Sequence, residues 1–253
     1  IPGNKAIAFG DSIDYCMIKV QESINNLIKD NKYLVAKSLL EEVCERCNIN
    51  KFELVKEIKG EELSNTICHH PFVKIGFDYD IPLLKAAFVE DSEGTGFVHI
   101  APCYGEDDYY LALDNNIVIK DIVKDDGCYR DNTPVFAGIH VFKAHLSVIE
   151  KLEEQNKLLG SREYRHSYPH SWRSKKPIIY RTTPQWFISM KSNNLKNKAM
   201  QGIEDTIWIP KSSKNRIQSM VENRPDWCVS RQRAWGVPLT IFINKNTGEP
   251  LKD

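Results

Sequence analysis

Apolar and polar residues follow patterns along the chain that predict strands and helices. Residues 31–47 carry apolar side chains at near-helical spacing and predict one long helix. Residues 51–58 alternate between apolar and charged side chains, as a half-buried strand does. Residues 82–89 and 94–100 read as two strands joined by the acidic turn 90–93 and predict a hairpin.

The C-terminal half shows a similar mixture of patterns. Residues 144–159 predict a second apolar-faced helix, and residues 193–203 and 214–222 predict two polar helices. Short strands are expected at residues 178–180 and 186–190. These elements predict a β-rich α+β domain over residues 1–190, followed by a basic helical linker and a further segment over 191–253.

Composition narrows the class of protein. The chain has 253 residues, 42% hydrophobic and 27% charged, which is the composition of a globular protein. It has no apolar run of about 18 residues and no signal-peptide pattern, so we expect no membrane span and no secretion. Its seven cysteines are scattered and odd in number, which favours a reducing, cytoplasmic setting.

The net charge of zero conceals a strong asymmetry. Residues 160–235 carry 15 Lys and Arg against 5 Asp and Glu, whereas residues 1–159 carry 17 against 27. A basic segment of this size fits either a solvated surface or a surface that grips an anionic partner. The asymmetry favours an anionic partner held mainly by the C-terminal third.

Residues 94–110 join a strand to a helix through a tight loop and form the strongest candidate for a functional corner. The turn Gly94-Thr95-Gly96 leads into a strand that carries His99. An acidic cluster that ends at Asp108 stands before a helix expected from Tyr109 onward, where the helix dipole stabilises negative charge. Substrate sites often lie on loops of this kind, although His99 alone also fits a packed core position and Asp108 an ordinary helix-start acid.

Other chemistry is not supported by the spacing of the cysteines and histidines. Cys44 and Cys47 have the spacing of a zinc-ligand pair, but they lie on the apolar face of the expected helix, where free cysteine packs as a small hydrophobe. His99 and Cys103 match a zinc-deaminase signature only in part, because its catalytic glutamate and second cysteine are absent. Cys103 lacks the surrounding signature of a catalytic nucleophile. We therefore expect no metal, and Cys103 fits an ordinary loop residue better than a nucleophile.

Three stretches resemble the isoleucyl-tRNA synthetases, a family of class I aminoacyl-tRNA synthetases. They read GTGFVHIAP with GEDDY (residues 94–109), HSYPHSWRSKKPIIYRTTPQWFISM (166–190) and NRPDWCVSRQRAWGVP (223–238). Their order matches the family, and the resemblance covers nearly the whole chain. His99 favours the isoleucyl members, because valyl enzymes carry lysine at this position and leucyl enzymes another residue.

The resemblance implies an editing function. It implies that residues 1–190 form the connective-peptide editing domain, a β-barrel with peripheral helices, which hydrolyses valine wrongly esterified to isoleucine tRNA. One methylene is worth only ~1–3 kcal/mol in a hydrophobic pocket, so a second, hydrolytic site is needed to remove the smaller product. The segment 191–253 would lead back toward the aminoacylation core, and the two class I catalytic signatures are absent, so we expect no aminoacylation by this piece.

The resemblance also implies roles for individual residues. Asp108 would hold the α-ammonium group of the misacylated amino acid, and His99 would line the pocket and limit the side chain that it admits. The substrate-binding residues expected from the resemblance are Gly94, Thr95, Gly96, His99 and Asp108. Water would attack the ester without a cofactor, whereas ATP and Mg²⁺ would serve the full-length parent.

The basic third would face the tRNA. Aromatic side chains can stack on the unpaired 3′ end while arginines contact phosphates. The expected contacts are Arg165, Tyr168, Trp172, Arg173, Arg231 and Arg233. Two departures from the family pattern stand out: serines at 171 and 174 replace a C-x-x-C pair, and Tyr104 replaces a frequent histidine.

A second hypothesis remains open. In the family, a threonine-rich peptide that lines the same pocket stands immediately before the position of Ile1, outside this sequence. The chain would then act as a non-catalytic tRNA-docking module. In either case the expected partner is tRNA(Ile), especially its aminoacylated 3′ end with valine or isoleucine, and the expected form is a cytoplasmic monomer.

Overall fold

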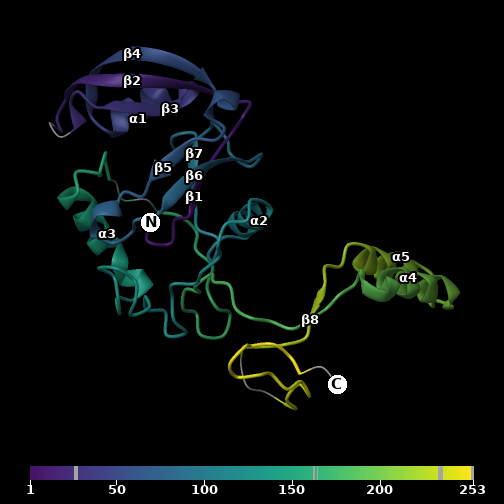
Figure 1. Ribbon diagram of the computed structural model, residues 1–253. Helices are drawn as coiled ribbons and strands as arrows, with labels where there is room; N and C mark the ends of the chain where they lie inside the picture. Colours follow the sequence, from purple (N-terminus) through teal and green to yellow (C-terminus); the bar gives the residue numbers. More distant parts are fainter. Residues whose placement is uncertain (26–27, 162, 164, 233–235, 252–253) are drawn as a thin grey trace. The chain divides into compact units, whose positions relative to one another are not determined.

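The computed structural model describes residues 1–25, 28–161, 163, 165–232 and 236–251. The chain divides into two compact units, Ile1–Thr182 and Thr183–Asp253, which are described separately here (Figure 1). Sheets and helices occur in the same unit, which confirms the predicted α+β class. The division at Thr182 lies near the domain boundary expected at residue 190.

The first sheet of the N-terminal unit is built around a short apolar strand. Its order is β5-β6-β1-β7, and its strands are β5 (Ile67–His69), β6 (Asp80–Lys85), β1 (Ala6–Phe9) and β7 (Phe97–Ile100). β1 runs parallel to β6 and antiparallel to β7, so the predicted hairpin between residues 82–89 and 94–100 is wrong. Ala6, Ala8 and Phe9 are fully buried, and such an apolar strand stabilises a sheet best from its centre.

The second sheet is antiparallel and has the order β3-β2-β4. Its strands are β2 (Asp14–Ser23), β3 (Lys32–Ala36) and β4 (Ile49–Lys59). The long helix predicted over residues 31–47 is therefore wrong in its first half, where Tyr33 and Val35 favour a strand that pairs with β2. The 3₁₀ turn η2 (Lys37–Leu39) and helix α1 (Leu40–Arg46) occupy the second half.

The expected β-barrel is not closed. Over the described ranges of the chain, the strands form separate open sheets. Figure 1 shows the β3-β2-β4 sheet beside the sheet that contains β1. One hydrophobic core joins β1, β2, β6 and β7 with α1, and includes Phe9, Tyr15, Ile18 and Ile100. A barrel forms only when the two edge strands of a sheet pair with each other, and the edge strands of these sheets keep backbone groups without a ladder partner. The prediction of a barrel is therefore wrong.

A second, aromatic core lies in the same unit. Phe72, Phe77, Tyr129 and Phe136 pack with the helix α3 (Ala144–Glu154), which ends before the predicted limit at residue 159. Between α2 (Glu106–Asp114) and α3 the chain forms only isolated bridges and the 3₁₀ turn η5 (Val141–Lys143). Two further 3₁₀ turns are η3 (Gly60–Leu63) and η4 (Val73–Ile75). The region between α2 and α3 contributes Val123, Tyr129, Val141 and Phe142 to the lining of the candidate pocket.

The C-terminal unit is small and, over the part of it that the structure describes, contains two helices and one short pair of strands. Its elements are β8 (Phe187–Ile188), η6 (Ser192–Asn194), α4 (Leu195–Asp205), α5 (Ser212–Glu222) and β9 (Trp227–Cys228). β8 pairs with β9, and both predicted polar helices are present within a few residues of their expected limits. Residues 178–180, at the end of the other unit, do not form the predicted strand. In the described residues, no helix has the length and apolar character needed to cross a bilayer.

Candidate functional site

The strand β7 and the helix α2 (Glu106–Asp114) place His99 and Asp108 at one corner. α2 begins at Glu106 rather than Tyr109, so all three acids of the cluster lie in its first turn, where they complement the helix dipole. Glu106 and Asp107 are exposed, whereas Asp108 is half-buried. Its Oδ2 accepts a hydrogen bond of 2.8 Å from the Ala101 backbone N–H, which ties the end of the strand to the start of the helix.

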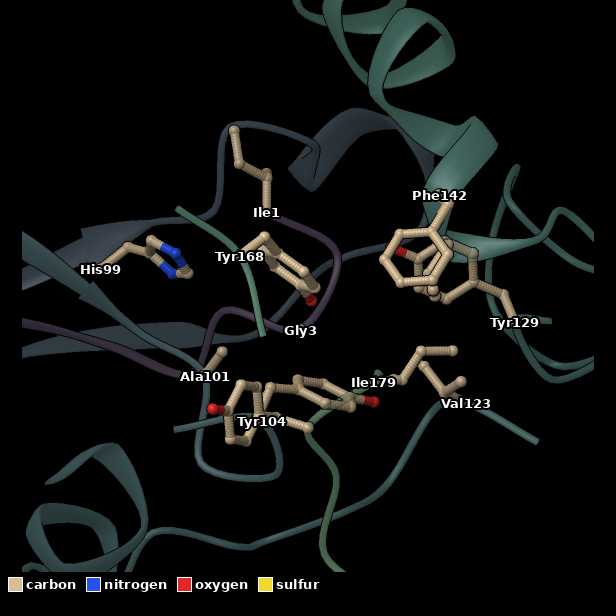
Figure 2. A pocket seen from close by; sticks show the side chains of 12 residues that line it. Ile1, Gly3, His99, Ala101, Tyr104, Val123, Tyr129, Phe142, Tyr168 and Ile179 are labelled. Atoms are coloured by element: carbon tan, nitrogen blue, oxygen red, sulfur yellow. The ribbon is translucent and has the colours of Figure 1, made fainter. Parts of the chain in front are cut away.

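A pocket of ≈ 290 Å³ opens beside this corner. Apart from His99, its walls are apolar or aromatic; they are formed by Ile1, Gly3, Ala101, Tyr104, Val123, Tyr129, Val141, Phe142, Tyr168, Ile179 and Tyr180. Figure 2 shows His99 at one end of the pocket and Phe142 with Tyr129 at the other. All of these residues belong to the N-terminal unit. A cavity with mostly apolar and aromatic walls, and with an imidazole at one end, suits a ligand that has both an apolar part and a polar part.

His99 keeps access to solvent, but the surrounding protein removes part of its hydration. This desolvation lowers the pKa of His99, and the Asp108 carboxylate opposes the effect. Over the described part of the chain, the imidazole forms no hydrogen bond. A neutral ring with both nitrogens available can therefore line the pocket without repelling a cationic ligand.

The turn at residues 94–96 is held by the second sheet. The Tyr15 hydroxyl donates a hydrogen bond of 2.8 Å to the Gly96 carbonyl, and the Ala36 N–H donates one of 2.9 Å to the Thr95 carbonyl. Gly96 has a φ of +78°, and a Cβ there would lie 2.4 Å from the Cβ of Ala36. Gly94 lines a different cavity from His99. The turn thus has a clear structural role, and contact of these three residues with substrate stays a prediction.

The predicted tRNA-contacting residues differ in their surroundings. Tyr168 lines the pocket itself, and its hydroxyl donates a hydrogen bond of 2.9 Å to the Ile178 carbonyl. Trp172 is 74% exposed, and the Arg173 guanidinium lies 4.7 Å from the centre of its ring. Arg165 is also exposed. Tyr168 and His99 therefore line the same pocket, which the sequence did not indicate.

The remaining two predicted contacts belong to the other unit. The Arg231 guanidinium donates hydrogen bonds of 3.1 Å and 2.7 Å to the carbonyl oxygens of Cys228 and Ser230, and the residue is exposed. Arg233 lies outside the described residues. A role in tRNA binding stays a prediction for both arginines.

Several pocket residues were not predicted as site residues. Tyr129 and Phe142 lie outside the three family-like stretches, and Tyr180 lies within the stretch 166–190 without a predicted role; the fold brings all three to the pocket that His99 lines. Tyr104 had a signal, since it departs from the family pattern, but its place in the wall needed the structure. Within the ranges that the structure describes, no three His, Cys, Asp or Glu side chains gather in a way that could hold a metal ion.

Comparison with known proteins gives the class of the protein. Residues 106–253 match the family model described as tRNA synthetases class I (I, L, M and V). This match covers more than half of the chain, and the chain belongs to that family.

The particular relatives are isoleucine--tRNA ligases. The chain is 50% identical over 253 residues to the isoleucine--tRNA ligase of Pelagibacter ubique and 41% identical over 267 residues to that of Gluconobacter oxydans. Each alignment covers 100% of this chain and 28% of the relative, so the chain spans about a quarter of the length of these proteins.

Solved structures show weaker likenesses. A crystal structure named GlLeuRS-CP1 is 16% identical, with a TM-score of 0.49 over 64% of this chain and 81% of that one. The editing domain of the cytosolic leucyl-tRNA synthetase of P. falciparum is 13% identical, with a TM-score of 0.35 over 91% of this chain and 66% of that one.

Proposed function

We propose that this chain carries the editing site of an isoleucyl-tRNA synthetase and hydrolyses the ester that links valine to tRNA(Ile). The observation that carries the proposal is one corner of the structure: His99 and Ala101 line an apolar pocket, and the Asp108 carboxylate beside it is hydrogen-bonded to the Ala101 backbone N–H. The 50% identity to an isoleucine--tRNA ligase over the whole chain supports the choice of family member.

Asp108 would bind the α-ammonium group of the esterified amino acid. Its Oδ2 is fixed by the Ala101 N–H, and its Oδ1 has no hydrogen-bond donor among the described residues. A fixed carboxylate with one oxygen available can accept a charge-assisted hydrogen bond from an ammonium group, which is among the stronger kinds in proteins. Since every aminoacyl ester carries this ammonium group, Asp108 would orient the substrate without choosing between amino acids.

His99 would act on the side chain. Because its pKa is lowered, the ring is neutral at neutral pH and does not repel the ammonium group beside it. The ring ends the pocket on that side, so it limits how far a branched side chain can extend. Water would attack the ester carbonyl and the tRNA hydroxyl would leave, which needs no cofactor. ATP and Mg²⁺ would serve the aminoacylation step of the full-length parent.

The partner would be tRNA(Ile), bound through its aminoacylated 3′ end in the cytoplasm. Tyr168 lines the pocket and Trp172 is exposed nearby in the sequence, so aromatic rings are available to stack on unpaired bases. Arg165 and Arg173 supply positive charge on the same segment for phosphate groups.

The test is deacylation of valyl-tRNA(Ile) by the full-length synthetase with Asp108→Ala. A hydrogen bond to a charged group is worth about 1.5–3 kcal/mol, so the rate should fall by about 10- to 100-fold. Asp107→Ala is the matched control, because Asp107 is an exposed acid of the same helical turn. We expect that variant to keep the wild-type rate.

The same experiment separates editing from the alternative of a docking module. Binding of tRNA(Ile) should be retained by Asp108→Ala, since the residue would contact the amino acid and not the nucleic acid. A wild-type synthetase that binds tRNA(Ile) and leaves the valyl ester intact would establish the docking module instead. Equal deacylation rates for the wild type and Asp108→Ala would remove Asp108 from the mechanism.

A further inference from the structure

We propose that Tyr104 is a specificity-determining residue: its ring is a fixed wall of the pocket that sets the largest amino acid side chain the site hydrolyses. This inference rests on the proposed editing function and extends it to a residue that the expected mechanism does not use. It follows from the way the ring is held, which differs from the way His99 is held.

The ring of Tyr104 is packed on the pocket side. It lines the same cavity as His99 and Ala101. A Cβ built on Gly3 would lie only 2.8 Å from the ring, so the Gly3 backbone is in close contact with it. The Tyr104 N–H donates a hydrogen bond of 2.8 Å to the Ala101 carbonyl, which places the residue in a tight turn directly after β7.

The hydroxyl of Tyr104 is anchored at the other end. It donates a hydrogen bond of 3.1 Å to Oδ1 of Asp121 and accepts one of 3.0 Å from the Ile122 N–H. Burial raises the pKa of this hydroxyl well above its usual range, so it remains protonated and keeps its donor role. The hydroxyl therefore uses both its donor and an acceptor position for bonds within the protein framework.

Asp121 is itself fixed. Its Oδ2 accepts hydrogen bonds of 2.9 Å from the Arg181 guanidinium and 3.1 Å from the Arg130 guanidinium. The side chains of Asp121 and Arg181 are 16% and 17% exposed, so this pair is little screened by water. Because Arg181 directly follows the pocket residue Tyr180, the same ion pair also fixes the chain beside that residue.

A wall anchored at both ends suits discrimination by size. A pocket distinguishes two side chains that differ by one methylene only if its walls do not move to admit the larger one. The available discrimination is about 10- to 200-fold, and a wall that moves loses it. Packing on Gly3 keeps the Tyr104 ring from moving away from the pocket side, and the hydrogen bonds to Asp121 and Ile122 hold its hydroxyl end in place.

The test compares deacylation of valyl-tRNA(Ile) and isoleucyl-tRNA(Ile) by the full-length synthetase. Tyr104→Ala should lower the ratio of the valyl to the isoleucyl rate by about tenfold, mainly because the isoleucyl ester becomes a substrate. Tyr110→Ala is the matched control, since Tyr110 lies on α2, is 57% exposed and does not line the pocket. A merely structural role for Tyr104 would lower both rates together and leave the ratio unchanged.

Two further variants protect the test against a folding defect. Tyr104→Leu keeps an apolar side chain in the wall and should shift the ratio in the same direction by a smaller factor. Tyr104→Phe keeps the ring and removes only the anchor, so its ratio should lie between those of the wild type and Tyr104→Leu. An unchanged ratio in a folded Tyr104→Leu variant would overturn the inference.

The outcomes also separate this inference from the proposed function. If the wild type hydrolyses the valyl ester and Asp108→Ala does not, the editing function stands whatever Tyr104 does. A wild type without deacylase activity would overturn the function and, with it, the role of Tyr104.

Discussion

His70 and His99 lie in the same unit and both have a lowered pKa, but they serve different purposes. His70 is 1% exposed and lies in the aromatic core, with its ring stacked on Phe77 at a centroid distance of 4.8 Å. Its Nδ1 accepts a hydrogen bond of 3.0 Å from the Phe72 N–H, so Nε2 carries the proton and donates to the Ile1 carbonyl at 3.1 Å. Both ring nitrogens are used by the framework.

His99 is the opposite case. It is exposed at the end of a pocket, and its nitrogens have no hydrogen-bond partner over the described residues. Residue pattern alone fitted His99 to a packed core position, but the packed core histidine of this unit is His70. A lowered pKa therefore does not separate the two histidines. They differ in their ring nitrogens, which the framework uses in His70 and which stay available to a ligand in His99.

The sharpest test of this contrast is the stability of alanine variants. His70→Ala should lower the free energy of unfolding by about 3–4 kcal/mol, because it leaves a cavity in an aromatic cluster and two backbone groups without partners. His99→Ala should change it by less than about 0.5 kcal/mol, as an exposed side chain does. Urea denaturation of both variants measures the difference. Equal losses would mean that His99 is also a framework residue.

The pH dependence of stability gives a second test. Burial lowers the pKa of His70 from its ordinary value of 6.5 to about 4. Between these two values the unfolded chain binds a proton that the folded chain does not, so stability rises with pH across this window. The free energy of unfolding should fall by about 2–3 kcal/mol as the pH drops from 6.5 to 4.

His70→Phe isolates this contribution. It keeps an aromatic ring in the cluster and removes the titrating group, so its stability should lose this part of the pH dependence. The carboxylates titrate in the same range in both proteins, and the difference between the two curves removes their effect. Parallel curves for the wild type and His70→Phe between pH 6.5 and 4 would contradict the assigned origin.

The sequence predicted the elements better than their pairing. β4, α2, α4 and α5 were expected close to their actual limits, because each has a regular local pattern. The helix expected over residues 31–47 was half wrong. The apolar spacing of Tyr33 and Val35 also fits a strand, and only the pairing with β2 determines that this segment is a strand and not a helix. The insertion of β1 between β6 and β7 is a contact between distant segments that no local pattern contains.

The site divides in the same way. His99 and Asp108 are nine residues apart in one motif, so the sequence alone could place them together. Tyr104 lies between them, but its hydroxyl is held by Asp121 and Asp121 by Arg181, which is far away in the chain. The residues proposed to bind the ligand were thus visible in the motif, whereas the residues that hold the wall were visible only in the fold.

The glycine turn sharpens the contrast between framework and ligand-facing groups. Gly96→Ala should lower the free energy of unfolding by about 2 kcal/mol, because its φ is +78° and the new Cβ would lie 2.4 Å from the Cβ of Ala36. Gly94→Ala has the same sign of φ, +79°, but no atom within 4 Å of the new Cβ, so about 1 kcal/mol is expected. Thermal or urea unfolding of both variants checks the order, and a larger loss for Gly94→Ala would contradict the packing of Gly96.

The smallest expected effect concerns the specificity that His99 gives to the proposed reaction. His99→Ala should leave hydrolysis of the valyl ester within about twofold of the wild-type rate and increase hydrolysis of the isoleucyl ester by about fivefold, which corresponds to about 1 kcal/mol. The effect should be smaller than that of Tyr104→Ala, because His99 is exposed and unanchored, and a side chain that can yield excludes a methylene less strictly than a fixed ring. Deacylation of both esters by the full-length synthetase measures it, with His145→Ala on α3 as a histidine control outside the pocket. If only the valyl ester is cleaved by His99→Ala, as by the wild type, His99 does not limit the side chain, and the wall formed by Tyr104 carries the discrimination alone.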